Sequence, residues 1–426
     1  MIADSNIRWR WAVAAGAAAG LVALIAAIAV LALARLTDPT PQIRNAFANG
    51  EIRADEAVST VFTQMGRTRK DCEIAGVFVT ADKKFGRFLF APQMPKDADR
   101  VLGVCQTVRD LALGGSAVTL DYKSVDTNPV GLRGITRLAL TAVPLLVWKG
   151  ILGLIIVAIA GGAAVILRRR NQFSPAALSL LAVSAIMAIV FATTSLSIGF
   201  GAVLWPLTVA AALLTDFSRP WRVVVMPALA GALAVLFDYQ SGLGASVLLT
   251  LILALGIRNP SWRPIGIAAA GYLAAAVTIV LAMGIAAATV RGLGPFGGAV
   301  MVIDRFTDFS AIFTPSGANG FVAALRSFAK FLARDDGAVG LGVYAGLCLI
   351  GFGGWALRLA GQRYVGAVIL GAEAALIAWI LFMFDRVSSA PQQYISLPLL
   401  LIAYTLAVQV VTFAPRASAK LESVSS

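Results

Sequence analysis

The sequence predicts an all-α polytopic membrane bundle of about ten transmembrane helices, with a small α+β extracytoplasmic domain between helices 1 and 2. The composition is 59% hydrophobic and only 13% charged, far from that of ordinary globular domains. Apolar runs repeatedly reach the roughly 20 residues that a helix needs to cross the hydrocarbon core. One polar stretch alternates helix and strand patterns. These three observations exclude the soluble classes.

The apolar runs define the predicted spans. Backbone inside a bilayer must satisfy its own hydrogen bonds, so each run is predicted to be a helix. An even number of spans would place both chain ends on one side of the membrane. The runs lie near residues 11–34, 150–167, 175–194, 198–215, 222–237, 243–257, 265–289, 339–357, 364–384 and 394–413.

The first run ends in Ala32, Leu33 and Ala34, which matches the small-x-small pattern of a signal-peptidase site. A signal peptide's apolar region spans about 7–15 residues, whereas this run is long enough to cross the bilayer. We therefore expect residues 1–35 to form a cytoplasmic N-terminus and an uncleaved anchor helix. A cleaved signal peptide is the alternative.

Basic residues mark the short connections between alternate spans and the two chain ends. The positive-inside rule assigns this side to the cytoplasm. The net charge of +13 then follows from topology, and no nucleic-acid partner is expected. We expect a multi-pass protein of the inner (cytoplasmic) membrane with both termini cytoplasmic, including the tail 414–426. The basic residues are Arg8, Arg10, Arg168, Arg169, Arg170, Arg219, Arg222, Arg258, Arg263, Arg358, Arg363, Arg416 and Lys420.

This orientation leaves two long segments outside, residues 36–134 and residues 290–338. Helices 2–7 occupy 135–289 and helices 8–10 occupy 339–413. The second external segment contains GFVAALRSFAKFLARDD, whose aromatic and basic residues lie on different faces of a predicted interfacial helix. Loops carry function when a rigid scaffold positions them, so the outer face is the predicted working face.

The first external segment, 36–134, is the predicted α+β domain. A disulfide between Cys72 and Cys105 would close a loop of about 34 residues and stabilise the domain by roughly 3–4 kcal/mol. Two free buried cysteines are the alternative. The predicted helices are PQIRNAFANGEI, DEAVSTVFTQM and DADRVLGVCQTVRDLAL, and the predicted strands are GVFVTA, GRFLFAP and AVTLDYKSV.

Charged and aromatic residues occur at the predicted outer ends of several spans. Asp238 and Tyr239 lie in the turn FDYQSG between the fifth and sixth spans, and a purely structural turn explains this composition equally well. An arginine fork binds phosphate oxygens, and a carboxylate accepts a proton from an attacking hydroxyl or holds a metal ion bound to the phosphate. The residues predicted to bind a lipid phosphate are Tyr122, Arg133, Arg137, Tyr239, Asp385 and Arg386.

Acidic residues are the candidates for proton transfer because the chain contains no histidine. We predict Asp71 and Asp238 as catalytic bases. The sequence identifies no cofactor, and a divalent metal ion is left open as an alternative. Glu373 lies within the ninth predicted span, where a carboxylate is costly and often functional. A structural hydrogen bond to a neighbouring helix is the alternative for Glu373.

Several short motifs resemble an uncharacterised family of polytopic bacterial membrane proteins, in order and approximate spacing. They are NAFANGEI, KDCEIAGVF, VCQTVRDLALGG, LDYKS, GLRGITR, FDYQSG and AAAGYLAAA. In that family an Asp-Cys pair opens the external domain and a Phe-Asp-Phe turn lies mid-chain. An aromatic and histidine stretch of the family is replaced here by VDTNPVGLRG, and the resemblance implies no specific activity. The matching positions are Asp71, Cys72, Tyr122, Arg133, Phe237, Asp238, Tyr239, Gly271 and Tyr272.

The layout of spans and the long first external segment also resemble integral-membrane glycosyltransferases that use polyprenyl-phosphate-sugar donors. This is a similarity of architecture. Those enzymes present an acidic residue in the first external loop, where Asp71 or Asp121 stands in this sequence.

The leading functional prediction is an enzyme of cell-envelope glycan or lipid assembly. It would transfer a sugar from a lipid-phosphate-linked donor at the outer face, with Asp71 or Asp238 as base. Its predicted partners are membrane lipid and the lipid-linked phosphate substrate, and the sequence identifies no protein partner. One alternative is a transporter or lipid flippase that uses Glu373. Another is a non-catalytic membrane partner whose external domain, 36–134, docks other envelope proteins.

Overall fold

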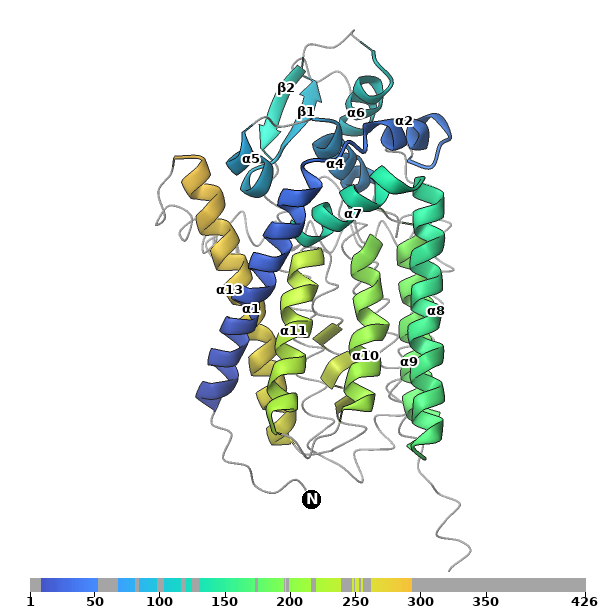
Figure 1. Ribbon diagram of the computed structural model, residues 1–426, viewed down its shortest axis with the longest axis vertical. Helices are drawn as coiled ribbons and strands as arrows, with labels where there is room; N and C mark the ends of the chain where they lie inside the picture. Colours follow the sequence, from blue (N-terminus) through green and yellow to red (C-terminus); the bar gives the residue numbers. More distant parts are fainter. Residues whose placement is uncertain are drawn as a thin grey trace, which may run out of the picture.

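The structure of the chain is a computed structural model (Figure 1). Four residues predicted to be functional, Tyr239, Glu373, Asp385 and Arg386, lie outside the residues that it describes, as do the last three predicted spans. The described residues are 9–52, 68–80, 84–97, 103–115, 120–124, 130–172, 175–194, 196, 199–215, 220–238, 247–248, 250–252, 254–255 and 262–292.

Long helices run side by side through the body of the molecule (Figure 1). Of the described residues, three helical segments are long and apolar enough to cross a membrane, namely Trp9–Ala34, Leu145–Arg169 and Arg263–Val290. They contain the predicted spans 11–34, 150–167 and 265–289. The helices of this bundle are α1 (Trp9–Ala34), α8 (Leu145–Arg169), α9 (Pro175–Thr194), the 3-10 helix η1 (Gly199–Val203) with α10 (Leu204–Leu214), α11 (Pro220–Asp238) and α13 (Trp262–Val290).

The outward faces of these helices are apolar. Ile25 on α1 is 67% exposed and Leu154 on α8 is 72% exposed. A water-soluble surface rarely presents such residues along whole helices, whereas lipid tails solvate them without cost. The helices therefore have the exterior expected of a membrane protein.

Helices α1, α11 and α13 pack with their backbones in close approach. A Cβ atom added to Gly16 would lie 2.5 Å from the Gly271 carbonyl oxygen of α13, and one added to Gly20 would lie 2.8 Å from that of Ala275. Gly231 of α11 meets the backbone of Tyr272 in the same way. Small residues four apart allow this approach between membrane helices. The glycine spacing in α1 is not among the features predicted from the sequence above.

Short elements form a cap over one end of the bundle, at the top of Figure 1. The two strands pair in antiparallel register, with Gln93 opposite Ser124 and Asp97 opposite Leu120. Helix α7 (Val130–Ala142) leads from the cap into α8. The cap consists of α2 (Thr40–Ala48), α4 (Thr68–Val79), α5 (Phe85–Phe90), β1 (Gln93–Asp97), α6 (Val104–Ala112) and β2 (Leu120–Ser124).

Two of the strand predictions for the cap are wrong. GVFVTA belongs largely to helix α4 and GRFLFAP largely to helix α5, whereas LDYKS forms strand β2 as predicted. Residues 71–78 of α4 are all buried, so neither helical nor strand periodicity is visible in their polarity. An apolar run buried on every side cannot be assigned by its period alone.

Cys72 of α4 and Cys105 of α6 form a disulfide, with their Cα atoms 5.1 Å apart. This is the pairing that the sequence analysis expected. Gly76 lies one turn further along α4, where a Cβ atom would come 2.9 Å from the Val108 side chain. The disulfide and the glycine together hold α4 and α6 closely against each other.

Replacing both cysteines by serine is expected to destabilise the cap by about 2–4 kcal/mol, because the unfolded chain regains the freedom of the open loop. The measurement is the rate at which protease cleaves the cap of the purified protein, compared between the variant and the wild type. Loss of the disulfide should speed cleavage in the cap and leave the rate in α8 unchanged. Equal cleavage rates in the cap would contradict this prediction.

Candidate functional site at the junction of the cap and the bundle

Buried charged side chains gather where the cap meets the bundle. We use the term junction for Asp71 of α4, Arg133 and Arg137 of α7, and the backbone groups that they bind. Asp71 is 8% exposed, Arg133 1% and Arg137 5%. A buried charge is costly unless it is paired or fully hydrogen-bonded. The partners of these three residues therefore determine what the junction does.

Arg133 binds the end of helix α5. Its Nη1 donates to the Phe88 carbonyl at 2.7 Å, and its Nη2 donates to the Leu89 carbonyl at 2.6 Å. The last carbonyls of a helix have no partner within the helix and carry a partial negative charge, which a guanidinium satisfies. Arg133 thus fixes the six-residue helix α5 to α7.

Arg137 joins three segments that are distant in sequence. Its Nε donates to the Ala34 carbonyl at 2.9 Å and its Nη2 to the Thr37 carbonyl at 2.6 Å. Its Nη1 makes a longer bond of 3.4 Å to the Phe78 carbonyl. Ala34 ends α1 and Phe78 lies in the last turn of α4, so Arg137 fastens the cap to the first membrane-length helix.

An acidic residue balances the charge of Arg137. Hydrogen bonds from the Thr40 side chain and backbone lower the pKa of the Asp38 carboxyl, and the charge of Arg137 lowers it further against the opposing effect of burial. Burial lowers the pKa of Arg137, and the Asp38 carboxylate opposes this shift. Arg137 stays protonated because a guanidinium loses its proton only far above physiological pH.

These contacts concern two residues of the predicted phosphate site. Arg133 and Arg137 were expected to present guanidinium forks to a lipid phosphate at the outer edge. The structure instead buries both side chains and directs their N–H groups to backbone carbonyls. These hydrogen bonds hold the junction together, and the phosphate role of the two arginines stays a prediction.

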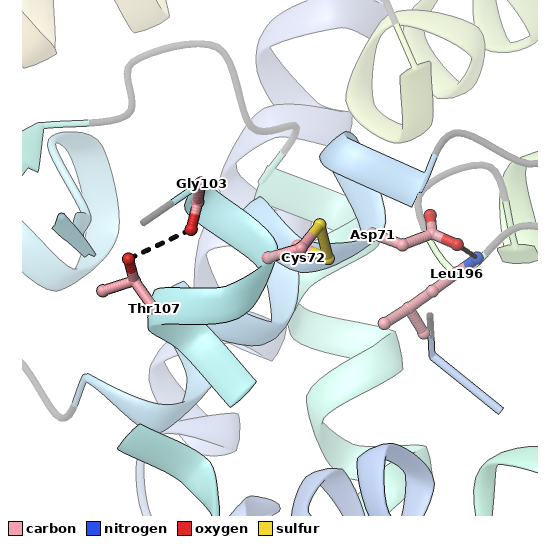
Figure 2. The surroundings of a disulfide bond; sticks show 6 residues. Asp71, Cys72, Gly103, Thr107 and Leu196 are labelled. Atoms are coloured by element: carbon pink, nitrogen blue, oxygen red, sulfur yellow. Dashed lines mark hydrogen bonds between the residues drawn. A yellow bond between two sulfur atoms is a disulfide. The ribbon is translucent and has the colours of Figure 1, made fainter. Parts of the chain in front are cut away.

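Asp71 also binds backbone. Its Oδ2 accepts a hydrogen bond of 2.8 Å from the Leu196 N–H, in the connection between α9 and η1 (Figure 2). The neighbouring residue, Cys72, carries the disulfide (Figure 2). A catalytic base has to reach the proton that it removes, and this carboxylate is buried against the bundle. The geometry favours a structural role for Asp71 over the predicted role of base.

Residues next to Asp238 pack against η1, which follows the connection that Asp71 binds. Asp238 is the last residue of α11, and the ring of Phe237 packs against Phe200 of η1 with centroids 5.0 Å apart. A Cβ atom added to Gly131, at the start of α7, would lie 3.1 Å from the Leu236 carbonyl oxygen. The end of α11 is thereby held between η1 and α7, at the junction.

The backbone therefore brings the two predicted bases, Asp71 and Asp238, to one region. Asp71 reaches the connection before η1, and Asp238 follows the helix end that packs on η1. Tyr122 lies in strand β2, at the position opposite Pro95. The described residues contain no group of three or more His, Cys, Asp or Glu side chains suited to a metal ion.

The arginines predicted to be cytoplasmic mark the end of the bundle opposite the cap. Arg10 lies in the first turn of α1, Arg168 and Arg169 end α8, and Arg222 and Arg263 lie in the first turns of α11 and α13. These helix ends lie together at the lower side of Figure 1. Of the arginines predicted to be cytoplasmic, the five named here thus lie at one end of the bundle.

Comparison of the chain with protein-family models, curated proteins and solved structures finds no match. The chemistry of the site has to be inferred from its geometry.

Proposed function

We propose that the protein is an inner-membrane enzyme of cell-envelope glycan or lipid assembly, which transfers a sugar from a lipid-phosphate-linked donor at the outer face. The observation that carries this proposal is the position of the disulfide-bonded cap at the end of the bundle opposite the arginine-bearing helix ends. A disulfide belongs to an oxidising compartment and the arginines belong to the cytoplasmic side. Both criteria support a cap on the outer side of the membrane.

The proposal includes the fold predicted from the sequence, a bundle of about ten spans with a small α+β domain outside. In this arrangement Asp238 is the general base, at the outer end of α11. Asp71, Arg133 and Arg137 fix the cap above it and have no direct part in the chemistry. The rigid junction would hold the donor's reacting carbon beside the base, since such positioning supplies much of an enzyme's rate enhancement.

Replacing Asp238 by asparagine tests the proposal. A general base contributes roughly 10²–10⁴-fold to a rate, so we expect transfer to fall at least about 100-fold. The measurement is the amount of envelope glycan made by host cells whose only copy of the protein carries the substitution. Asp110→Asn on α6 is the matched control, because it makes the same chemical change in the cap, away from the end of α11.

Protein levels in the membrane have to be equal in the three strains, and the variants should unfold at the wild-type temperature in detergent. Unchanged glycan in the Asp238→Asn strain under these conditions would remove Asp238 from the mechanism. Equal losses in the Asp110→Asn strain would point to a defect of the cap as a whole.

A second candidate function is a non-catalytic envelope partner that docks other proteins through its cap. The side chains of Asp71, Arg133 and Arg137 bind backbone groups. These hydrogen bonds favour the second function, because three residues predicted to take part in the chemistry already have structural partners. Under this hypothesis, acidic substitutions leave glycan unchanged, and cross-linking from the cap captures one protein in constant ratio. The transporter alternative rests on Glu373, which lies outside the described residues.

A further inference from the structure

Large aromatic side chains are exposed at the end of the bundle opposite the cap. Trp9 and Trp11 lie in the first turn of α1, and Trp221 lies in the first turn of α11. All three side chains are exposed, with Trp11 at 70% and Trp221 at 57%. The starts of both helices lie at the lower side of Figure 1. We call Trp9, Trp11 and Trp221 the tryptophan belt.

Arginines are interleaved with the tryptophan belt. Arg10 is exposed between the two tryptophans of α1, and the guanidinium carbon of Arg222 lies 5.4 Å from the centroid of the Trp221 ring. The ring of Trp9 also reaches α13, since a Cβ atom added to Gly266 would lie 2.6 Å from its Cη2 atom. A guanidinium is costly inside the hydrocarbon of a bilayer. The belt therefore suits the boundary of the hydrocarbon core better than its interior.

The surface of α1 that follows the belt is aliphatic. Lipid tails solvate aliphatic side chains without cost. An indole joins a large apolar ring to a polar N–H, and it is most stable where hydrocarbon meets the headgroups. The change from indole to aliphatic side chains thus has the pattern of a helix that enters the hydrocarbon core. The exposed aliphatic residues of α1 are Val13, Leu21, Val22, Ile25 and Leu33.

The length of α1 between the belt and the cap agrees with this assignment. Leu31 lies 20 residues after Trp11, which corresponds to about 30 Å of helix. The hydrocarbon core of a bilayer is about 30 Å thick. Leu31 packs in one apolar cluster with Phe88 and Leu89 of α5, so the cap contacts α1 at this level. The belt and the cap are therefore about one hydrocarbon thickness apart.

We infer that the tryptophan belt binds the headgroup region of a phospholipid bilayer, in the leaflet at the end opposite the cap, and so fixes the depth of the bundle in the membrane. The indole rings lie between the acyl chains and the glycerol groups. The same depth places Asp238, 17 residues after Trp221 in α11, about 26 Å away and near the boundary on the cap side. This inference requires a bundle that crosses a membrane and is independent of the proposed sugar transfer.

The test is quenching of tryptophan fluorescence in the full-length protein, reconstituted into vesicles of brominated phosphatidylcholine. One lipid carries bromine on the acyl carbons nearer the headgroup, the other carries it nearer the chain tips, and bromine quenches only indoles close to it. The chain contains 8 tryptophans, so the signal of Trp11 is the difference between the wild type and Trp11→Phe. We expect shallow bromine to quench this difference signal at least about twice as strongly as deep bromine.

Val22 provides a matched control on the same helix. It is 66% exposed and lies about three helical turns from Trp11, on the same face of α1. In Trp11→Phe/Val22→Trp the indole moves to the middle of the bilayer. Its signal, taken as the difference from Trp11→Phe, should be quenched more strongly by deep bromine. The same preference as at Trp11 would overturn the inference, because α1 would then not cross the bilayer at this depth.

Trp221→Phe repeats the measurement on α11, and it carries the test if Trp11→Phe does not fold. Each variant should elute with the wild type in size-exclusion chromatography. Equal quenching of the belt by both lipids, or stronger quenching by deep bromine, would overturn the inference. Absence of quenching would overturn it too, because a second copy of the chain, another protein or water would then cover the belt.

Discussion

Replacing Arg133 by methionine should lower the free energy of unfolding by about 3–5 kcal/mol. The substitution preserves most of the buried volume and removes the charge, so the loss comes from the hydrogen bonds. Two charge-assisted bonds to the Phe88 and Leu89 carbonyls disappear, each worth about 1.5–3 kcal/mol. The carbonyls at the end of α5 are then left without these donors in a buried environment, and part of the penalty is their desolvation.

Arg87→Met is the matched control. It makes the same substitution at an exposed arginine of α5, the helix whose carbonyls Arg133 binds. A surface substitution of this kind is usually worth less than about 0.5 kcal/mol. The measurement is unfolding of the purified protein in mild detergent, followed by tryptophan fluorescence during titration with a denaturing detergent. Equal stabilities of the two variants would show that Arg133 does not hold the cap to the bundle.

Replacing Gly231 by leucine should destabilise the protein by about 4 kcal/mol or more, a loss that few single substitutions reach. A Cβ atom at this position would overlap the backbone of Tyr272 on α13. Backbone atoms cannot rotate aside as a flexible side chain can, so α11 and α13 have to separate. Separation removes close contacts along both helices. In a membrane, such contacts are what hold helices together.

Gly153→Leu on α8 provides the control, because no atom lies within 4 Å of a Cβ added there. Leucine is apolar and favours helix, so this variant should be as stable as the wild type or slightly more stable. Gly231→Ala should fall between the wild type and Gly231→Leu. The readout is the temperature at which half of the protein leaves the monodisperse peak in size-exclusion chromatography. A Gly231→Leu protein as heat-stable as Gly153→Leu would refute the close crossing.

These two expectations concern how firmly the helices pack on each other and how firmly the cap is held at one end of the bundle. Arg137 bonds to Ala34 at the end of α1, and α1 in turn packs through Gly16 and Gly20 on α13. Asp71 bonds to the connection after α9. The cap is thus held to several helices by hydrogen bonds between side chains and backbone groups. Under the proposed function, the reaction at Asp238 would take place beneath a firmly held cap.

The sequence by itself determined the membrane-length helices and the disulfide. The spans near 11–34, 150–167 and 265–289 lie within helices of the structure, because membrane preference is a sum of local transfer free energies over about 20 residues. The cysteine pairing followed from Cys72 and Cys105 being the cysteines outside the apolar runs. Such properties need no knowledge of which segments meet in space.

Only the tertiary structure decided what the polar residues do. Arg137 was expected at a phosphate, yet its partner is the carbonyl of Ala34, 103 residues away in the chain. Nothing in the local sequence distinguishes a guanidinium that meets phosphate from one that meets a helix end, since both present negative oxygen atoms. In α4 and α5 the same limit applies to secondary structure, because burial on every side removes the periodicity that a sequence reveals.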